Sequence, residues 1–197
     1  PVLSYNPVEG TRKPGSVGIG LPRTDIEIVD IETGSKVLQP GEVGEIRARG
    51  PQIMQGYRGL AEETAQALKG GWLYTSDIGE FDADGYLFIR DRKKDMVIVG
   101  GFNVYPREIE EVLLTHPDVQ EAAVVGIPDS YRGEALVAYV VGKHAPPEAD
   151  TLLAYLGERL VRYKLPAHIR PIAALPKTAV GKTDKPALRE MALLSKD

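Results

Sequence analysis

The stretch that decides the fold is Asp91-Arg-Lys-Lys-Asp-Met-Val-Ile-Val-Gly-Gly-Phe-Asn-Val-Tyr-Pro-Arg-Glu-Ile-Glu110. Its charged start, residues 91–95, is followed by the apolar run Met96 to Val99 and then by Gly100-Gly101. Pro106 suits the first position of a helix, and the glutamates after it suit the positive end of the helix dipole. The stretch therefore predicts a strand, a tight turn and an amphipathic helix, with a domain boundary in the charged run.

The sequence before this boundary is typical of antiparallel β-structure. Short alternating runs occupy residues 25–29, 44–49 and 85–90, with turn dipeptides between them. One helix is expected from Glu62 to about Lys69, where Gly70-Gly71 would end it. Residues 1–92 are therefore predicted to form a β-rich subdomain, shaped as a small distorted barrel.

The sequence after the boundary alternates helices with strands. Asp150 and Asp184 are the expected N-caps of the second and third helices in this part. Together with the strand at Met96 to Val99, the pattern is β-α-β-β-α-β, which gives the whole chain the α+β class. Residues 93–197 are thus expected to be a small domain whose further strands lie at 121–126, 135–142 and 169–175.

Composition excludes several classes of function. The 197 residues include 24 basic and 28 acidic residues, for a net charge of -4, which argues against a general electrostatic grip on nucleic acid. No apolar stretch approaches the roughly 20 residues of a membrane helix. Cysteine is absent, and His116, His144 and His168 lack ligand spacing, so no metal site is expected. These features fit a cytoplasmic protein, and a start at Pro1 without a leader-like pattern suggests a segment of a longer chain.

Three segments resemble the later core motifs of the adenylate-forming superfamily, which contains acyl-CoA synthetases, peptide-synthetase adenylation domains and luciferases. They are Trp72-Leu-Tyr-Thr-Ser-Asp77, the stretch 91–110 quoted above, and Pro176-Lys-Thr-Ala-Val-Gly-Lys-Thr-Asp184. Residues 15–20 and 44–57 make the resemblance strongest to fatty-acid CoA ligases. The resemblance implies ATP-dependent activation of a carboxylic acid, expected to be a fatty acid, as acyl-adenylate, followed by transfer of the acyl group to CoA.

The resemblance also assigns roles to individual residues. Lys182 matches the lysine that stabilises negative charge when the carboxylate attacks the α-phosphate. Asp77 matches the carboxylate that accepts the ribose hydroxyls of the nucleotide, and Arg92 an arginine that contacts the ribose or phosphate. Ser76 stands where the family usually has glycine. Without the companion motifs, Lys182 would be interpreted as an exposed loop lysine and Asp77 as a turn residue.

Two further roles concern the movement of the C-terminal domain and the path of the CoA thiol. Lys94 matches the residue at which the C-terminal domain pivots between the half-reactions, although the charged run alone would indicate only a solvated loop. Gly100 and Gly101 match the turn that lines the tunnel for the pantetheine arm of CoA, and both also suit a plain β-turn.

The resemblance implies that the phosphate loop, the Mg²⁺-coordinating glutamate and most of the acyl pocket lie before Pro1. We therefore expect these residues alone to be inactive and to expose an apolar surface that could mediate oligomerisation. An aryl or other small-acid CoA ligase, and a peptide-synthetase adenylation domain, remain alternatives. A ligand-binding or regulatory module without chemistry is the non-enzymatic alternative.

Overall fold

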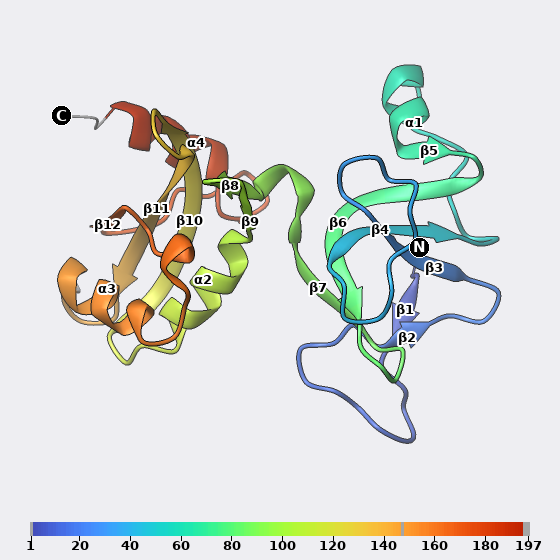
Figure 1. The fold of residues 1–197 in the computed structure, drawn as a ribbon, viewed down its shortest axis with the longest axis horizontal. Helices are drawn as coiled ribbons and strands as arrows, with labels where there is room; N and C mark the ends of the chain where they lie inside the picture. The colour runs from blue at the N-terminus through green and yellow to red at the C-terminus, as the bar shows by residue number, and fades with distance from the viewer. Residues whose placement is uncertain (1, 147, 195–197) are drawn as a thin grey trace. The chain divides into compact units, whose positions relative to one another are not determined.

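The computed structural model describes residues 2–146 and 148–194. The chain divides into two compact units, Pro1–Lys94 (unit 1) and Asp95–Asp197 (unit 2). Each unit has its own sheets, as the ribbon in Figure 1 shows, and its own buried core. The division falls inside the charged run that the sequence marks as a boundary.

Unit 1 is built on antiparallel strands around the long strand β6 (Trp72–Phe81). One edge of β6 pairs with β4 (Gly44–Arg49), which in turn pairs with β3 (Asp25–Val29). The other edge pairs first with β5 (Leu68–Lys69) and then with β7 (Leu87–Arg92). The remaining elements of unit 1 are β1 (Ser4–Tyr5), β2 (Ile19–Gly20) and helix α1 (Ala61–Ala67).

The core of unit 1 is small. Its buried cluster consists of Ile28, Ile46 and Leu87, with partly buried aliphatic and aromatic side chains around it. Leu87 also forms an antiparallel β-bridge with Gly18, and this bridge links β7 to the β1–β2 pair. The expected distorted barrel is therefore an open half-barrel of two linked antiparallel sheets.

Unit 2 is a sheet in the order β10-β11-β8-β9, with β12 pairing parallel to β11. Helices α2 and α3 pack on one face of this sheet and α4 packs on the other (Figure 1). Its strands are β8 (Val97–Val99), β9 (Phe102–Val104), β10 (Val119–Asp129), β11 (Gly133–Gly142) and β12 (His168–Pro171). Its helices are α2 (Pro106–Leu114), α3 (Ala149–Gly157) and α4 (Lys185–Leu194), with short 3₁₀ turns η1 (Lys93–Asp95), which begins in unit 1, and η2 (Arg162–Lys164).

Alternation along β10 and β11 explains why unit 2 has a core on both faces. Successive strand residues point to opposite sides, so a run of apolar residues supplies both layers. In β11, Leu136, Ala138 and Val140 face α2 and α3, whereas the residues between them face α4. The α+β class and the helix–strand alternation predicted for this part are thereby confirmed.

Several predicted element boundaries are wrong. The helix expected to reach Lys69 ends at Ala67, because Leu68 and Lys69 pair with Leu73 and Trp72 in a hairpin. Asp150 is not the cap of α3: the N-cap is Glu148, and no side chain bonds the free N–H groups there. The strand expected over 169–175 is β12, which ends at Pro171.

The charged run is also more ordered than a solvated loop. Asp91 lies inside β7 and is 7% exposed, and Lys93, Lys94 and Asp95 form η1. By contrast, Asp184 does cap α4, since its carboxylate accepts the N–H of Ala187 at 3.1 Å.

Candidate functional site

Asp77 sits at an irregularity in the middle of β6. Arg47 of β4 pairs with Tyr74 and Glu45 with Ile78, so three residues of β6 oppose Ile46 alone. The hydroxyl of Thr75 donates to the carbonyl of Ile46 at 2.8 Å and accepts the N–H of Asp77 at 3.1 Å. Such a bulge re-aims a side chain next to a site.

Ser76, at the centre of this bulge, has φ 60. This left-handed conformation costs a residue with a Cβ roughly 1 kcal/mol or more, whereas glycine adopts it freely. A glycine, which the resemblance leads us to expect here, would suit this backbone, and in this chain serine adopts the strained conformation.

The carboxylate of Asp77 is paired with Arg92. Nε of Arg92 lies 2.8 Å from Oδ1 of Asp77, and residues 77 and 92 are register partners on β6 and β7. Burial raises the pKa of Asp77 above its ordinary value, and the charge of Arg92 opposes this rise without cancelling it. This contact with Arg92 uses Oδ1 alone, so Oδ2 of Asp77 can accept a hydrogen bond from another group.

A hollow of about 340 Å³ lies beside Asp77 in unit 1. Apart from Ser4, Thr75 and Asp77, its walls are aliphatic. A half-buried carboxylate at the edge of an apolar hollow is suited to a ligand with hydroxyl groups next to an apolar part. The aliphatic residues that line it are Leu3, Val17, Ile26, Ile46, Leu87 and Ile89.

Lys94 is flanked by two ion pairs. On its unit 1 side, Lys93 donates to Glu45 at 2.7 Å, and the Glu45 side chain is only 6% exposed. On its unit 2 side, Arg189 of α4 donates to Asp95 at 2.8 Å. Lys94 itself is exposed and makes no ion pair with the described residues. The neighbours are therefore anchored and Lys94 is not.

Gly100 and Gly101 form the tight turn between β8 and β9. Val99 pairs with Phe102, and the two glycines have φ 58 and φ 85. Positive φ at both central positions is the type I′ turn, for which glycine is strongly preferred. A Cβ built on either glycine would meet nothing within 4 Å, so this edge of the hairpin is open. Phe102 next to it is 55% exposed and stacks on Tyr163 at 4.5 Å.

Lys182 lies on a short hairpin-like loop before α4. Lys177 and Thr183 form an antiparallel β-bridge, and the N–H of Thr178 donates to the carbonyl of Lys182 at 2.7 Å. Lys177 pairs with Glu121, and Lys185 pairs with Glu110 at 2.8 Å. Lys182 is exposed and has no carboxylate partner among the described residues. Its ammonium group is therefore the free charge of this loop within the described part of the chain.

The structure thus brings Asp77 and Arg92 together, and it places Gly100-Gly101 and Lys182 on separate segments of unit 2. Sequence reasoning missed the partners Glu45 and Arg189, because a strand glutamate and a helix arginine carry no sign of burial on their own. Residues 2–146 and 148–194 contain no group of three His, Cys, Asp or Glu side chains that could hold a metal ion. No helix within them is both long enough and apolar enough to cross a membrane.

Comparison with known proteins gives matches over both units. Residues 1–58 match the model of the AMP-binding enzyme family, and residues 108–182 match that of the AMP-binding enzyme C-terminal domain. A long-chain-fatty-acid–CoA ligase of Bacillus subtilis is 49% identical over 183 residues, which are 92% of this chain and 32% of the relative. A 2-succinylbenzoate–CoA ligase of Geobacillus kaustophilus is 41% identical over 96% of this chain and 38% of the relative.

A solved structure agrees with these matches. ATP-bound MatB from Rhodopseudomonas palustris is 39% identical and superposes with a TM-score of 0.89, over 96% of this chain and 38% of that one. The chain spans about a third of the length of the curated relatives that it matches. With family matches in both units and the three motifs in their expected order, the chain belongs to the adenylate-forming, AMP-binding enzyme family.

Proposed function

We propose that this chain is the C-terminal part of an AMP-forming acid–thiol ligase that activates a fatty acid with ATP and transfers it to CoA. The observation that carries the proposal is the free ammonium group of Lys182, which lies between Lys177 and Lys185, two lysines that are held in ion pairs. An exposed, uncompensated cation on a short loop can approach a polyphosphate without breaking an existing contact.

In the first half-reaction, the carboxylate oxygen of the acid attacks the α-phosphorus of ATP, and the bond to the pyrophosphate oxygen breaks. Both reactants are anions, so negative charge accumulates at the transferred group and a cation lowers the barrier. Lys182 supplies that cation. Asp77 accepts the ribose hydroxyls through its available oxygen, while Arg92 holds the other oxygen and faces the nucleotide phosphate or ribose.

In the second half-reaction, the thiol of CoA attacks the acyl carbon of the adenylate, and AMP leaves. The open edge of the Gly100-Gly101 turn gives a narrow thiol arm access to the backbone. The two steps need different groups of unit 2 at the same reacting atoms. Lys94, free between two anchored neighbours, is the proposed pivot that exchanges them.

The fatty-acid assignment rests on the name of the 49% identical relative. The 2-succinylbenzoate–CoA ligase at 41% identity supports an aromatic acid as the second candidate. The proposal keeps the Mg²⁺ ligand outside this chain, as the resemblance implies.

The test is ATP–pyrophosphate exchange by the full-length protein with a panel of long-chain fatty acids, short-chain acids and aromatic acids including 2-succinylbenzoate. We expect exchange with long-chain acids and acyl-CoA formation when CoA is added. Asp77→Asn should raise the KM for ATP at least tenfold. Asp25→Asn is the matched control, since Asp25 is also a strand carboxylate paired with an arginine at 2.8 Å, that of Arg49. Exchange with no acid in the panel would refute the proposal, and exchange with aromatic acids alone would replace the fatty-acid assignment.

A further inference from the structure

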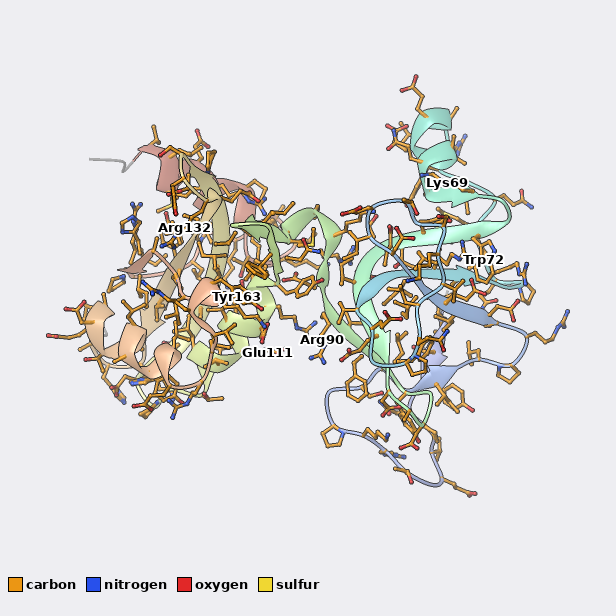
Figure 2. The ribbon with its side chains drawn as sticks, viewed as in Figure 1. Lys69, Trp72, Arg90, Glu111, Arg132 and Tyr163 are labelled. Atoms are coloured by element: carbon orange, nitrogen blue, oxygen red, sulfur yellow. The ribbon has the colours of Figure 1, made fainter. Side chains whose placement is uncertain are left out.

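The carboxylate of Glu110, on α2, binds two donors from two other segments of unit 2. Its Oε1 accepts the N–H of Val124 at 2.8 Å and lies 2.8 Å from Nζ of Lys185. The side chains of Glu110 and Lys185 are 16% and 17% exposed, so this ion pair is largely shielded from water. The next residue, Glu111, is labelled on α2 in Figure 2; it is exposed and pairs with Arg107 of its own helix. Glu110 therefore ties α2 to β10 and to the start of α4.

The contact with Val124 lies at the outer edge of the unit 2 sheet. β10 is the first strand in the order β10-β11-β8-β9, and Val124 is the register partner of Ala138 on β11. The N–H of Val124 points away from β11, toward Glu110. A buried backbone donor at a sheet edge needs a partner, and the carboxylate supplies one. Glu110 is thus held in place by a backbone group of the sheet.

The loop that carries Lys182 is held together by its own backbone. The N–H of Gly181 donates to the carbonyl of Thr178 at 2.8 Å, and the N–H of Asp184 donates to the carbonyl of Pro176 at 2.8 Å. With the bond from Thr178 to Lys182, they close a narrow two-sided loop that has Lys182 beside its tip. We expect such a loop to move as one piece, so that its direction depends on what its two ends contact.

The two ends of this loop have unequal charged contacts. Lys177, before the loop, pairs with Glu121 of β10, and both side chains are more than a third exposed. Water and salt weaken such a pair, so its net contribution is usually small. Lys185, after the loop, is the first residue of α4 and pairs with the shielded carboxylate of Glu110. The contact with Glu110 is therefore the stronger of the two.

We propose that Glu110 is a positioning residue for the adenylation step: through Lys185 it directs the Lys182 loop toward the reacting phosphate. This inference rests on the proposed function, because that function gives Lys182 its role. Lys182 stabilises the transition state only when its ammonium group stands close to the transferred phosphate. A small tilt of the loop consequently lowers the rate more than it weakens ATP binding. Glu110 itself takes no part in making or breaking bonds.

The test measures ATP–pyrophosphate exchange by the full-length protein with Glu110→Gln. The glutamine oxygen can still accept the N–H of Val124, but the charge that holds Lys185 is gone. We expect kcat for exchange to fall about tenfold, with a change of less than about twofold in the KM for ATP. Thioester formation from supplied acyl-adenylate should stay nearly normal.

Glu108→Gln is the matched control. Glu108 lies on the same helix and pairs with Lys164 at 2.6 Å, a lysine that belongs neither to the Lys182 loop nor to α4. Removing its charge should leave the kcat of exchange within about twofold. An equal loss of exchange in Glu108→Gln and Glu110→Gln would overturn the inference.

Variants of Lys185 and Lys182 separate positioning from folding. Lys185→Arg keeps a cation opposite Glu110 and should retain most of the exchange activity, whereas Lys185→Met should match Glu110→Gln. If Glu110→Gln does not fold, Lys185→Met carries the same test, because it leaves the contact with Val124 in place. In the Lys182→Ala background, Glu110→Gln should cause no further loss of exchange, since the group that it positions is absent.

The outcomes distinguish this inference from the proposed function. If Lys182→Ala slows exchange while Glu110→Gln and Lys185→Met do not, the inference fails and the proposed function stands. A further loss from Glu110→Gln in the Lys182→Ala background would also overturn the inference, because Glu110 would then act by another route. If Lys182→Ala leaves exchange unchanged, the role of that lysine in the proposed function is refuted and the inference is overturned with it.

Discussion

The two units differ in how completely they bury their apolar residues. Unit 2 has buried clusters on both faces of its sheet, including Leu113, Leu152 and Leu156 on one face and Leu188 on the other. The buried cluster of unit 1 is smaller, with Ile28, Ile46 and Leu87 at its centre, and an aliphatic hollow opens beside it. Apolar surface that stays open is costly for an independent domain and is typical of a surface that packs on something else. We therefore expect unit 2 to fold by itself and unit 1 not to.

Separation of the units gives the largest expected effect. A cut between Lys94 and Asp95 leaves both flanking ion pairs intact, since Glu45 and Lys93 stay in one piece and Asp95 and Arg189 in the other. We expect residues 95–197 to unfold in one cooperative transition and residues 1–94 to bind a dye for exposed apolar surface and to lack such a transition. Circular dichroism melts of the two pieces provide the measurement. A cooperative melt of residues 1–94, with none from residues 95–197, would reverse the comparison.

A smaller effect is expected at the boundary between the units. Lys93→Met leaves the buried carboxylate of Glu45 without its partner, so the free energy of unfolding should fall by about 2 kcal/mol. Lys94→Met is the matched control, because Lys94 is exposed and has no ion pair among the described residues, and it should change stability by less than about 0.5 kcal/mol. Urea denaturation of the 197-residue chain measures both. Equal losses in the two variants would show that Lys94 is held as firmly as its neighbour.

The smallest effect on stability is expected at Asp77, and the sign of its dependence on pH can be predicted. Its pKa is raised in the folded chain, so the ionised form opposes folding above that pKa, and the opposition disappears below the ordinary value of 3.8, where both states are protonated. Asp77→Asn should therefore raise Tm at pH 7, and the gain should fade as the pH falls through the raised pKa and be absent below 3.8. Asp25→Asn should show no such gain. A lower Tm for Asp77→Asn at pH 7 would mean that the contact with Arg92 outweighs burial.

The sequence predicts the kinds of element well where a repeating pattern covers many residues. The alternating apolar runs of β10 and β11 and the glycine pair between β8 and β9 are examples, because side-chain period and positive φ are local properties. The end of α1 and the cap of α3 depend on partners elsewhere, such as the pairing of Leu68 with Leu73, and were predicted wrongly.

In the candidate site, too, the sequence predicts local features but not those that depend on distant partners. The motifs place Asp77, Arg92, Lys94, Gly100, Gly101 and Lys182, but a motif cannot show which charge lacks a partner. That Lys182 is free while Lys177 and Lys185 are paired depends on Glu121 and Glu110, which come from distant segments. The bulge at Ser76 likewise depends on the register between β4 and β6, which no single strand reveals.

The central claim is that two segments of unit 2 serve different half-reactions. It is tested most directly by measuring both half-reactions of the full-length protein with Lys182→Ala and Gly101→Leu. Gly85→Leu is the control for backbone strain, because Gly85 has φ 79, close to φ 85 at Gly101, and also has nothing within 4 Å of a built Cβ.

Lys182→Ala should slow ATP–pyrophosphate exchange about 10²- to 10³-fold and leave thioester formation from supplied acyl-adenylate nearly normal. Gly101→Leu should do the opposite, keeping exchange while acyl-CoA production is lost, and Gly85→Leu should keep both activities. If Lys182→Ala and Gly101→Leu instead impair the two half-reactions equally, the separate roles assigned to these segments are wrong.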